Sequence, residues 1–387
     1  MDRKMRVLVT GSKGFIGRNL VVVLRQLPDV EVFEFNLDVP ESVMEEGLTK
    51  ADIIFHLAGI NRPENPEDFS TGNTGFTQEL CERLRTLGRK PMIIFSSSIQ
   101  AELDNPYGRS KRKAEKVLLS FSEQTGAQVV IFRMKNVFGK WCRPNYNSAV
   151  ATFCHNIARN LPISISDRAN EVKLVYVDDV CAAMMEVSGL LPSPPEHFVS
   201  LTDSVYADIA PTFNLTLGAL VDTIRSFKAT RSSFQVPAFD DPFIRRLYAT
   251  YLSHLEKTDF ACTLDIKTDN NGSLSEFLKS VSFGQISIFS MKAGIKWGNH
   301  YHHTKTEKIL IVQGQAIIRF RDMRSEGGNQ GSDVIEYPVS GEEFRVVDIP
   351  PGYAHAIENV GKGELVALFW ANQVFNSEHP DTYFEEV

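Results

Sequence analysis

The sequence predicts two domains of different classes, an α/β unit with a doubly wound parallel sheet and an all-β barrel that follows it. Up to about residue 257, short apolar runs alternate with helical patterns, which is typical of βαβ units. Beyond that point, short strands with alternating apolar and polar residues are separated by turns rich in Gly and Pro, which indicates a barrel. The 387 residues suit two domains, which we place at 1–256 and 257–387.

Apolar runs predict the individual strands. In the α/β domain the predicted strands cover residues 5–10, 30–35, 51–57, 91–97 and 129–133, with helices ending at Leu24 and covering 111–124. In the barrel the predicted strands cover residues 285–290, 308–312, 316–320, 343–349 and 365–370. We interpret 227–257 as a linker with a helix near 242–255, because Pro237 and Pro242 interrupt its pattern.

Composition excludes several functions. The 41 Lys and Arg against 48 Asp and Glu leave a net charge of -7, so nothing indicates the basic surface that a nucleic-acid partner requires. No apolar stretch is long enough to span a bilayer, and the run Val7–Val9 is too short for a signal-peptide core. The five scattered cysteines form no Cys-x-x-Cys pair, which predicts reduced thiols. We therefore expect a cytoplasmic protein with no membrane partner.

A Gly-x-x-Gly-x-x-Gly pattern follows the first predicted strand directly. Gly11 allows a tight turn, Gly14 lets the backbone approach a pyrophosphate, and Gly17 lets the next helix pack close to the sheet. The N-terminus of that helix would direct free N–H groups at the phosphates. The pattern predicts a Rossmann-type dinucleotide site that includes Phe15 and Ile16, and an ordinary Gly-rich turn is the alternative.

Two polar positions bear on the choice of cofactor. An acidic residue at the end of the second strand binds the ribose hydroxyls of NAD, but the uncharged Asn36 occupies this position. Arg18 is placed to reach a 2′-phosphate, so we predict NADPH. The alternatives are that Arg18 is a solvated residue of the first turn and that Glu34 or Asp38 contacts the ribose.

A Tyr-x-x-x-Lys pair and a serine run predict the chemistry of the α/β domain. Tyr107 and Lys111 would share one helix face, where the ammonium lowers the pKa of the phenol. The phenol would then give a proton to a carbonyl oxygen as hydride reaches the carbon. Ser98 is expected to hold that oxygen, with Ser97 as the alternate. A helix start with a solvated lysine is the alternative interpretation.

Four residues of the barrel predict a metal centre. On a strand, His300 and His302 lie on the same side, and we expect Glu307 and His355 on neighbouring strands. Three imidazoles and one carboxylate suit Zn²⁺, Fe²⁺, Mn²⁺ or Ni²⁺. A surface pair of histidines is the alternative for His-x-His alone.

The glycine, serine and Tyr-x-x-x-Lys motifs make roughly the first 250 residues resemble the extended short-chain dehydrogenase/reductase family. The segment His56–Gly59 is similar to its adenine-side segment, Arg133–Gly139 to its loop beside nicotinamide and sugar, and Val177–Val180 to its late helix start. The resemblance implies cofactor contacts from Leu57, Ala58, Gly59 and Arg133. One departure is the gap of nine positions from Ser98 to Tyr107, which is shorter than in many nucleotide-sugar members.

The two histidine segments resemble the signature motifs of the cupin superfamily of jelly-roll barrels. Only the opening glycine of the second motif is missing, where Phe344 stands. The resemblance implies one divalent metal, expected to be zinc, among His300, His302, Glu307 and His355.

Reductase and cupin in this order resemble the bifunctional reductase/epimerase family of bacterial capsular polysaccharide synthesis, above all in residues 98–108 and 136–154. The resemblance implies a UDP-sugar partner: the cupin epimerises C3 of a UDP-4-keto-6-deoxy-HexNAc, and the first domain reduces C4 with NADPH. The product would be UDP-2-acetamido-2,6-dideoxy-L-talose, a precursor of UDP-N-acetyl-L-fucosamine. A homodimer is expected, and the implied substrate contacts are Asn136, Asn147 and Arg168.

Several alternatives stay open. The epimerisation base is undecided among His303, Lys296 and Tyr353, and the metal either polarises the ketone or only holds the strands. One rival function is a dehydrogenase fused to an iron cupin dioxygenase, which the bound metal would distinguish. Another is a non-catalytic dinucleotide sensor with a sugar-binding cupin, although a sensor needs no proton donor such as Tyr107.

Overall fold

The computed structural model describes all residues except 1–2, 62–64, 66, 192–195, 201–204 and 324–333. It forms two compact units, which we call the α/β unit (Met1–Arg225 with Arg246–Glu256) and the barrel unit (Ser226–Arg245 with Lys257–Val387). Residues 226–245 thus belong with the barrel, whereas the sequence placed them in the first domain. The reason is backbone pairing, because Val236 N–H donates to Lys279 O at 2.8 Å and Lys279 N–H donates to Phe234 O at 2.8 Å.

The α/β unit is built on a seven-stranded sheet in the order β2-β1-β3-β4-β5-β9-β8, parallel except for the last pair. Its strands are β1 (Met5–Thr10), β2 (Val30–Phe35), β3 (Ile53–His56), β4 (Met92–Ser98), β5 (Val129–Met134), β8 (Phe198–Ser200) and β9 (Tyr206–Ile209). The five predicted strands are confirmed, each within two residues of its expected ends. They form because each is a short stretch rich in apolar residues. The sheet buries β3 completely, whereas in β2 only Phe33 and Phe35 are buried.

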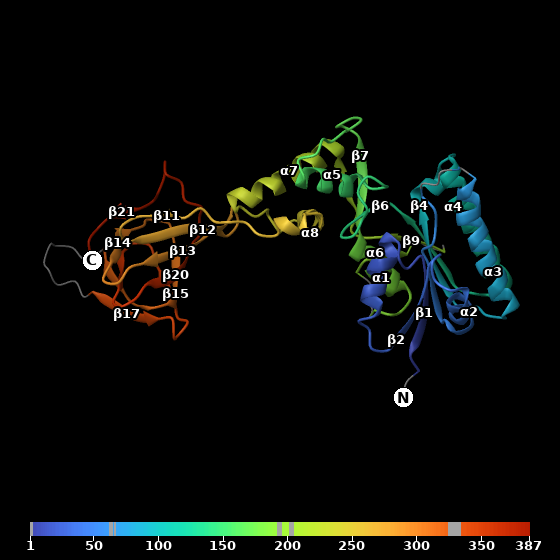
Figure 1. Cartoon of the computed structure of the whole chain (residues 1–387), viewed down its shortest axis with the longest axis horizontal. Helices are drawn as coiled ribbons and strands as arrows, with labels where there is room; N and C mark the ends of the chain where they lie inside the picture. Colours follow the sequence, from blue (N-terminus) through green and yellow to red (C-terminus); the bar gives the residue numbers. More distant parts are fainter. Residues whose placement is uncertain (1–2, 62–64, 66, 192–195, 201–204, 324–333) are drawn as a thin grey trace. The chain divides into compact units, whose positions relative to one another are not determined.

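Helices cover both faces of this sheet (Figure 1). One face carries α1 (Phe15–Leu24) and α6 (Val177–Val187), and the other carries α2 (Glu41–Lys50), α3 (Phe76–Thr86) and α4 (Pro106–Thr125). Each helix buries an apolar stripe, for example Leu20 and Leu24 of α1 in one core and Leu118 and Phe121 of α4 in the other. The doubly wound α/β prediction is confirmed.

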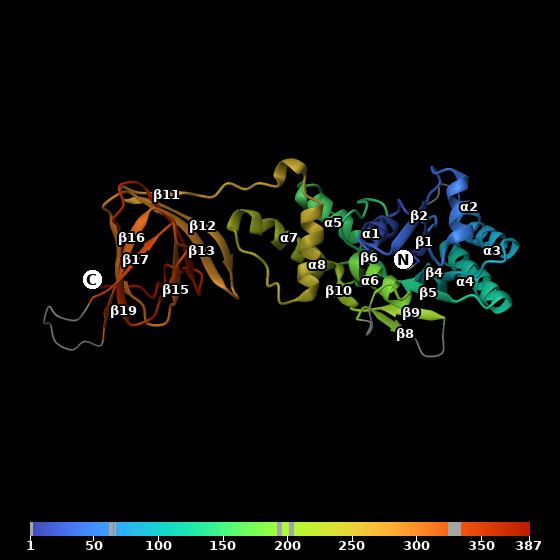
Figure 2. The ribbon, with the colours of Figure 1, turned by 90° about the horizontal axis from the view of Figure 1, so that it is seen from below.

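A smaller sheet and three helices complete the region after β5 (Figure 2). The sheet has the order β10-β7-β6, with β6 (Asn136–Phe138), β7 (Glu171–Tyr176) and β10 (Phe213–Thr216). The helices are α5 (Ala149–Ala158), α7 (Leu217–Ser233) and α8 (Pro242–Ser253). The sequence pattern predicted α8 but neither β10 nor most of α7, since these segments carry weaker apolar periodicity. None of the helices in the described residues is long and apolar enough to cross a membrane.

The barrel unit consists of two antiparallel sheets. The first has the order β11-β12-β13-β20-β15-β18, with β11 (Lys267–Thr268), β12 (Gly272–Ser280), β13 (Gly284–Met291), β20 (Leu365–Ala371), β15 (Glu307–Gln313) and β18 (Val346–Ile349). The second has the order β17-β16-β19-β14-β21, with β17 (Ile335–Ser340), β16 (Gln315–Asp322), β19 (Tyr353–Asn359), β14 (Lys296–Tyr301) and β21 (Tyr383–Phe384). Residues such as Phe289, Ile311 and Ile318 form the core. The all-β prediction is confirmed.

Candidate active site and metal centre

The glycine turn after β1 has no room for side chains at Gly11 and Gly17. Gly11 has φ +71°, and a Cβ there would lie 2.8 Å from the Ala58 backbone. A Cβ on Gly17 would lie 2.2 Å from the Gly11 carbonyl oxygen. No side chain caps the start of α1 at Gly14, so the first N–H groups of this helix are free to bind a ligand. The turn therefore has the backbone geometry that a pyrophosphate requires.

A cavity of about 1100 Å³ opens from this turn along the carboxyl ends of the strands, the usual ligand position in such sheets. Thirteen of the sequence-predicted site residues line it: Gly11, Gly14, Phe15, Ile16, Gly17, Arg18, Leu57, Gly59, Ser98, Tyr107, Lys111, Asn136 and Asn147. Its volume is large enough for a dinucleotide and part of a second ligand.

Tyr107 and Lys111 lie on the first turns of α4, directed at this cavity. Asn105 caps the helix by accepting the Gly108 N–H at 2.8 Å, and Pro106 occupies the first turn. The half-buried Tyr107 lines the cavity together with Ser98 at the end of β4. The buried Lys111 ammonium donates to the Ser96 carbonyl oxygen at 2.9 Å. The start of α4 and the end of β4 thus place a phenol, an ammonium and a hydroxyl in the lining of this cavity.

The three serines that end β4 have different surroundings. All three line the cavity, but Ser97 is buried and its hydroxyl donates to a Glu115 carboxylate oxygen at 2.5 Å. Ser98 is half-buried and lines the cavity, where its oxygen also accepts the Gln100 N–H at 3.2 Å. This geometry favours Ser98 over the alternate Ser97 as the group that meets a ligand.

Burial governs the protonation of both helix residues. It raises the pKa of Tyr107, with a smaller opposing effect of the Ser98 hydrogen bond. It lowers the pKa of Lys111 to about 8, against the raising effect of Glu115. The expected lowering of the Tyr107 pKa by Lys111 is therefore wrong for this geometry. A protonated phenol at neutral pH is the form that donates a proton.

The structure corrects two predicted arginines, neither of which lines the cavity. The Arg133 guanidinium binds the Glu115 carboxylate at 2.7 and 3.1 Å and Glu102 at 2.9 Å, so its donors are engaged inside the protein. Arg168 is more than half exposed and donates to Asp222 at 2.5 Å. The sequence motif that suggested Arg133 thus places it between the buried Glu115 and the exposed Glu102.

Asn36 and Ala58 also lie outside the cavity lining. Asn36 follows β2 directly, as predicted, but its amide donates to Asp38 Oδ1 at 3.0 Å. Asp38 also pairs with Lys13, and hydrogen bonding by Asn36, followed by that of Lys13, lowers the pKa of Asp38 to about 2. The Ala58 N–H donates to Thr10 Oγ1 at 3.3 Å, so this residue supports the turn.

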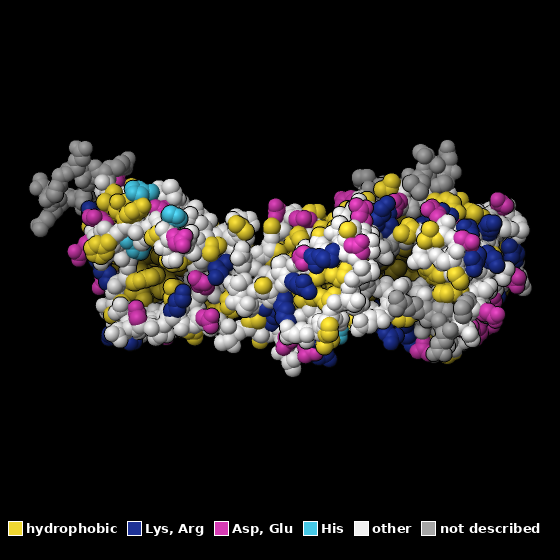
Figure 3. All heavy atoms as spheres, turned by 90° about the horizontal axis from the view of Figure 1, so that it is seen from above, with side chains coloured by type: hydrophobic (Ala, Val, Ile, Leu, Met, Phe, Trp, Pro, Cys, Tyr) yellow, Lys and Arg dark blue, Asp and Glu magenta, His cyan; other side chains and the backbone are white. Residues whose placement is uncertain are grey.

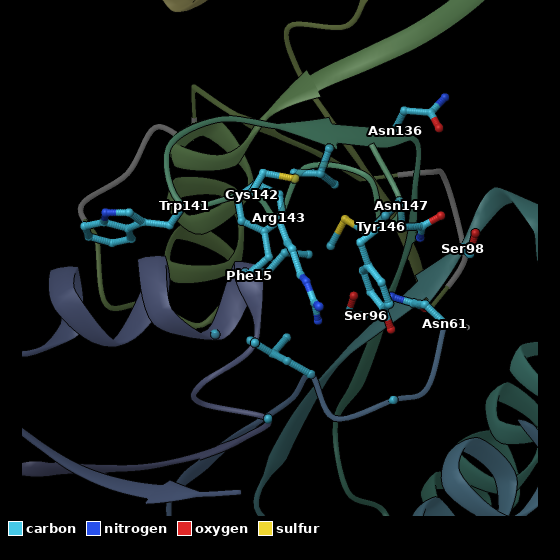
Figure 4. Close-up of a pocket in the computed structure, with 18 of the residues that line it drawn as sticks. Phe15, Asn61, Ser96, Ser98, Asn136, Trp141, Cys142, Arg143, Tyr146 and Asn147 are labelled. Atoms are coloured by element: carbon cyan, nitrogen blue, oxygen red, sulfur yellow. The ribbon is translucent and has the colours of Figure 1, made fainter. Parts of the chain in front are cut away.

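Sequence reasoning missed the far part of the cavity. Arg143 and Tyr146 extend from the segment after β6 into the pocket, whereas Trp141 points away from its centre (Figure 4). Arg159 and His254 line the end of the pocket, and Arg159 donates to the His254 carbonyl oxygen at 2.8 Å. No signal could have joined these two residues, because they lie 95 positions apart in the chain.

His254 stands out in this part of the cavity. Its Nε2 atom is buried and has no hydrogen-bond partner among the described residues. Burial, reinforced by the charges of His155 and Arg159, lowers the pKa of His254 to about 4. A buried ring nitrogen without a partner is unusual, and it marks His254 as a residue of this wall to test by substitution.

The barrel unit brings His300, His302, Glu307 and His355 together, with their ligand atoms all within 4.8 Å of one another. A bulge in β14, where Gly298 and Asn299 have φ of 109° and 55°, places His300 opposite His355 on β19. The ring centroids of these two histidines are 4.5 Å apart. Figure 3 shows that histidine side chains, in cyan, reach the surface of this unit.

The cluster has the chemistry of a cation site. His302 Nε2 and Glu307 Oε2 are buried without hydrogen-bond partners in the described structure, although His302 Nε2 lies 3.1 Å from Glu307 Oε1. Burial by itself raises the pKa of Glu307. The facing His302 and His355 imidazoles outweigh burial, so the net effect lowers this pKa to about 2. Burial, with the neighbouring His355 and His302, lowers the pKa of His300 to about 4. A carboxylate with a neutral imidazole is the state that binds metal, so the residues fit a divalent cation.

The three residues considered as epimerisation bases lie around this cluster in different settings. Lys296 Nζ donates to the Val387 carbonyl oxygen at 2.5 Å and is thereby occupied. His303 packs against the Tyr301 and Tyr383 rings, with centroids 5.4 and 4.7 Å away. Tyr353 is half-buried with its ring 6.5 Å from Phe320. The geometry selects none of the three.

Comparison with known proteins agrees with this architecture along the whole chain. Residues 7–190 match the NAD dependent epimerase/dehydratase family, and residues 267–383 match the polysaccharide biosynthesis C-terminal domain. The UDP-2-acetamido-2,6-beta-L-arabino-hexul-4-ose reductase of Pseudomonas aeruginosa is 42% identical over 98% of both chains. The crystal structure of the capsular polysaccharide assembling protein CapF from Staphylococcus aureus is 43% identical, with a TM-score of 0.88, covering 99% of this chain and 100% of that one. This chain belongs to the CapF family.

CapF-family membership confirms the resemblance that the motifs predicted. It assigns the chain to the sugar-nucleotide reductases and epimerases of capsular polysaccharide synthesis. A more distant structure, UDP-glucuronic acid 4-epimerase from Bacillus cereus in complex with NAD, is 18% identical with a TM-score of 0.52 over 65% of this chain and 96% of that one. At this distance the similarity concerns the fold of the α/β unit alone.

Proposed function

We propose that the α/β unit reduces the C4 ketone of a UDP-4-keto-6-deoxy-HexNAc with NADPH. The product would be UDP-2-acetamido-2,6-dideoxy-L-talose, a precursor of UDP-N-acetyl-L-fucosamine in capsule or O-antigen synthesis. The observation that carries the proposal is the placement of Tyr107, Ser98 and Lys111 in the same cavity as the glycine turn. The name of the reductase from Pseudomonas aeruginosa supports the substrate class.

The roles in the reductase follow from the positions of the side chains. A bound nicotinamide would supply the hydride, held by the free N–H groups of α1 and by Gly11, Gly14 and Gly17. Tyr107, protonated because burial raises its pKa, donates its proton to the ketone oxygen. Ser98 donates a hydrogen bond to that oxygen. The Lys111 ammonium does not set the resting pKa of Tyr107, but we propose that it opposes the negative charge that develops as the proton leaves. Asn136 and Asn147 are proposed to position the sugar nucleotide from the facing wall.

We propose NADPH because two cations, Lys13 and Arg18, line the cavity beside the turn that follows β2. Lys13 already pairs with Asp38, so Arg18 is the better candidate for a 2′-phosphate. Arg18→Ala is expected to lower kcat/KM for NADPH about 10- to 100-fold, the loss of a charge-assisted hydrogen bond, with little effect on NADH. Arg25→Ala, at a position where Arg25 pairs with Glu34, serves as the control. An equal loss for both cofactors would contradict the preference.

We further propose that the barrel unit epimerises C3. His300, His302, Glu307 and His355 would hold one divalent cation, expected to be zinc, which would polarise the 4-ketone and make the C3 proton acidic. The unsatisfied His302 Nε2 and Glu307 Oε2 atoms support the site. All five cysteines, which lie in the described part of the chain, are free, in keeping with the proposed cytoplasmic location. A homodimer stays a prediction, which analytical ultracentrifugation tests.

One experiment tests both activities. The protein is incubated with NADPH and a UDP-4-keto-6-deoxy-HexNAc in D₂O, while absorbance follows the nicotinamide and NMR follows deuterium at C3. We expect loss of nicotinamide absorbance and incorporation of deuterium at C3. Absorbance loss without deuterium would contradict the epimerase, and deuterium without absorbance loss would contradict the reductase.

A further inference from the structure

The chain segment Pro380–Thr382, which we call the C-terminal clip, binds the loop between two of the clustered residues. The Asp381 carboxylate accepts the backbone N–H groups of His303, Thr304 and Lys305 at 3.0, 2.9 and 2.8 Å. It also accepts the Thr304 hydroxyl at 2.8 Å. These four bonds hold the turn between His302 and Glu307 in one conformation.

The clip also contacts the cluster itself. The Asp381 carbonyl oxygen lies 2.6 Å from His302 Nδ1, which must then carry the proton. His302 Nε2 is consequently left with its lone pair, and it is the buried atom without a hydrogen-bond partner. Metal-binding histidines commonly have their second nitrogen held in this way by a carbonyl or carboxylate.

A buried lysine links the clip to Glu307. Lys305 Nζ donates to the Pro380 carbonyl oxygen at 3.1 Å and to Thr382 Oγ1 at 2.9 Å. The same ammonium lies 3.7 Å from Glu307 Oε1. The clip therefore contacts the His302 ring directly, and it contacts Glu307 through the Lys305 ammonium.

The strand that follows anchors the clip. β21 pairs with β14, so Phe384 lies opposite His300 and Tyr383 opposite Tyr301. Asp381 itself has φ 41°, a left-handed conformation that an ordinary residue adopts only when its surroundings hold it there. Its several bonds to the loop supply that support.

We propose that the C-terminal clip retains the cation, with Asp381 as a positioning residue that fixes the tautomer and orientation of His302. This inference rests on the metal site put forward under the proposed function. The Asp381 carboxylate bonds hold the clip against the 303–305 turn, and without them the Asp381 backbone carbonyl would no longer be fixed against His302 Nδ1. We expect the affinity for a divalent cation to fall about 10- to 100-fold, the usual effect of removing such a supporting group.

The test uses the full-length protein loaded with Zn²⁺ or Co²⁺. Zn²⁺ affinity is measured by competition with a chromophoric chelator, and the visible absorption of bound Co²⁺ reports the geometry of its ligands. Asp381→Ala is expected to weaken Zn²⁺ binding about 10- to 100-fold and to change the Co²⁺ spectrum. Glu378→Ala is the matched control, because Glu378 is an exposed acidic residue that precedes the clip. It should bind both metals as the unaltered protein does.

Two milder variants keep the proposal testable if Asp381→Ala does not fold. Asp381→Asn keeps a side-chain oxygen that can accept a hydrogen bond but removes the charge, and Thr382→Val removes one acceptor of Lys305. Each is expected to weaken Zn²⁺ binding about 3- to 10-fold, as the loss of a single net hydrogen bond does. Unchanged affinity and an unchanged Co²⁺ spectrum in these folded variants would overturn the role of the clip. If the unaltered protein itself binds neither metal, the proposed metal site fails instead.

Discussion

The cavity of the α/β unit and the histidine cluster of the barrel unit are built on opposite principles. The cavity has a volume of about 1100 Å³ and takes its walls from residues between Gly11 and Leu255. The cluster comes from residues 300–355, and its four ligand atoms lie within 4.8 Å of one another. The first site relies on backbone shape to receive a large ligand, whereas the second relies on side-chain atoms that converge on a point. A single side-chain change should therefore remove one step of chemistry in the cavity but the whole site in the cluster.

The sharpest separation of the two sites is expected from Tyr107→Phe. Removing the proton donor should lower kcat for NADPH oxidation about 10²- to 10⁴-fold, the usual contribution of a general acid. Cofactor binding, measured by NADPH fluorescence, should stay unchanged, and so should deuterium exchange at C3. Turnover at the original rate would show that Tyr107 is not the donor and would favour a different use of the cavity.

Removal of the metal is expected to affect only the barrel unit. Chelation should lower C3 exchange about 100-fold or more, since a Lewis acid contributes several kcal/mol to such a step. NADPH oxidation with the C3-epimerised ketone should continue, and added Zn²⁺ should restore exchange. If circular dichroism shows a folded barrel and exchange persists without metal, the cation serves only the structure.

The reductase activity of the α/β unit should depend on pH through Lys111. Burial lowers the pKa of Lys111 to about 8, against the raising effect of Glu115. The ammonium is therefore lost as pH rises through this value, well below the ordinary range of lysine. We expect kcat for NADPH oxidation to fall about tenfold per pH unit above it if only the charged form supports catalysis. A flat profile to about pH 10 would contradict a role for the charge, and Lys111→Met should lose the pH dependence.

The smallest expected effect concerns His254, whose Nε2 atom lies unsatisfied in the cavity wall. His254→Ala should raise KM for the sugar nucleotide about 3- to 10-fold, the value of one hydrogen bond, and leave kcat nearly unchanged. His254→Gln keeps a polar group near the position of Nε2 and should restore part of the affinity. Steady-state kinetics with unchanged KM in both variants would assign His254 to packing alone.

Much of this architecture was predictable because its signals are local. The strands β1 and β2 begin and end at the residues that the sequence pattern predicted. The four clustered residues of the barrel are recognisable since i, i+2 spacing on a strand sets His300 beside His302. The predicted cofactor contacts Arg133 and Asn36 do not line the cavity in this structure. Arg133 binds the Glu115 carboxylate, and the Asn36 amide donates to Asp38, two positions away.

The sequence by itself determined the two fold classes, the glycine turn, the Tyr107–Lys111 pair and the identity of the four clustered residues. These depend on periodicity and spacing within a few residues, which fix strand and helix faces before any long-range packing. Only the tertiary structure decided that Ser98 rather than Ser97 faces Tyr107, that His254 completes the far end of the cavity, and that Asp381 holds His302. The physical reason is that a hydrogen bond across 79 positions depends on how distant strands pair. The residues next to either partner in the sequence do not determine that pairing.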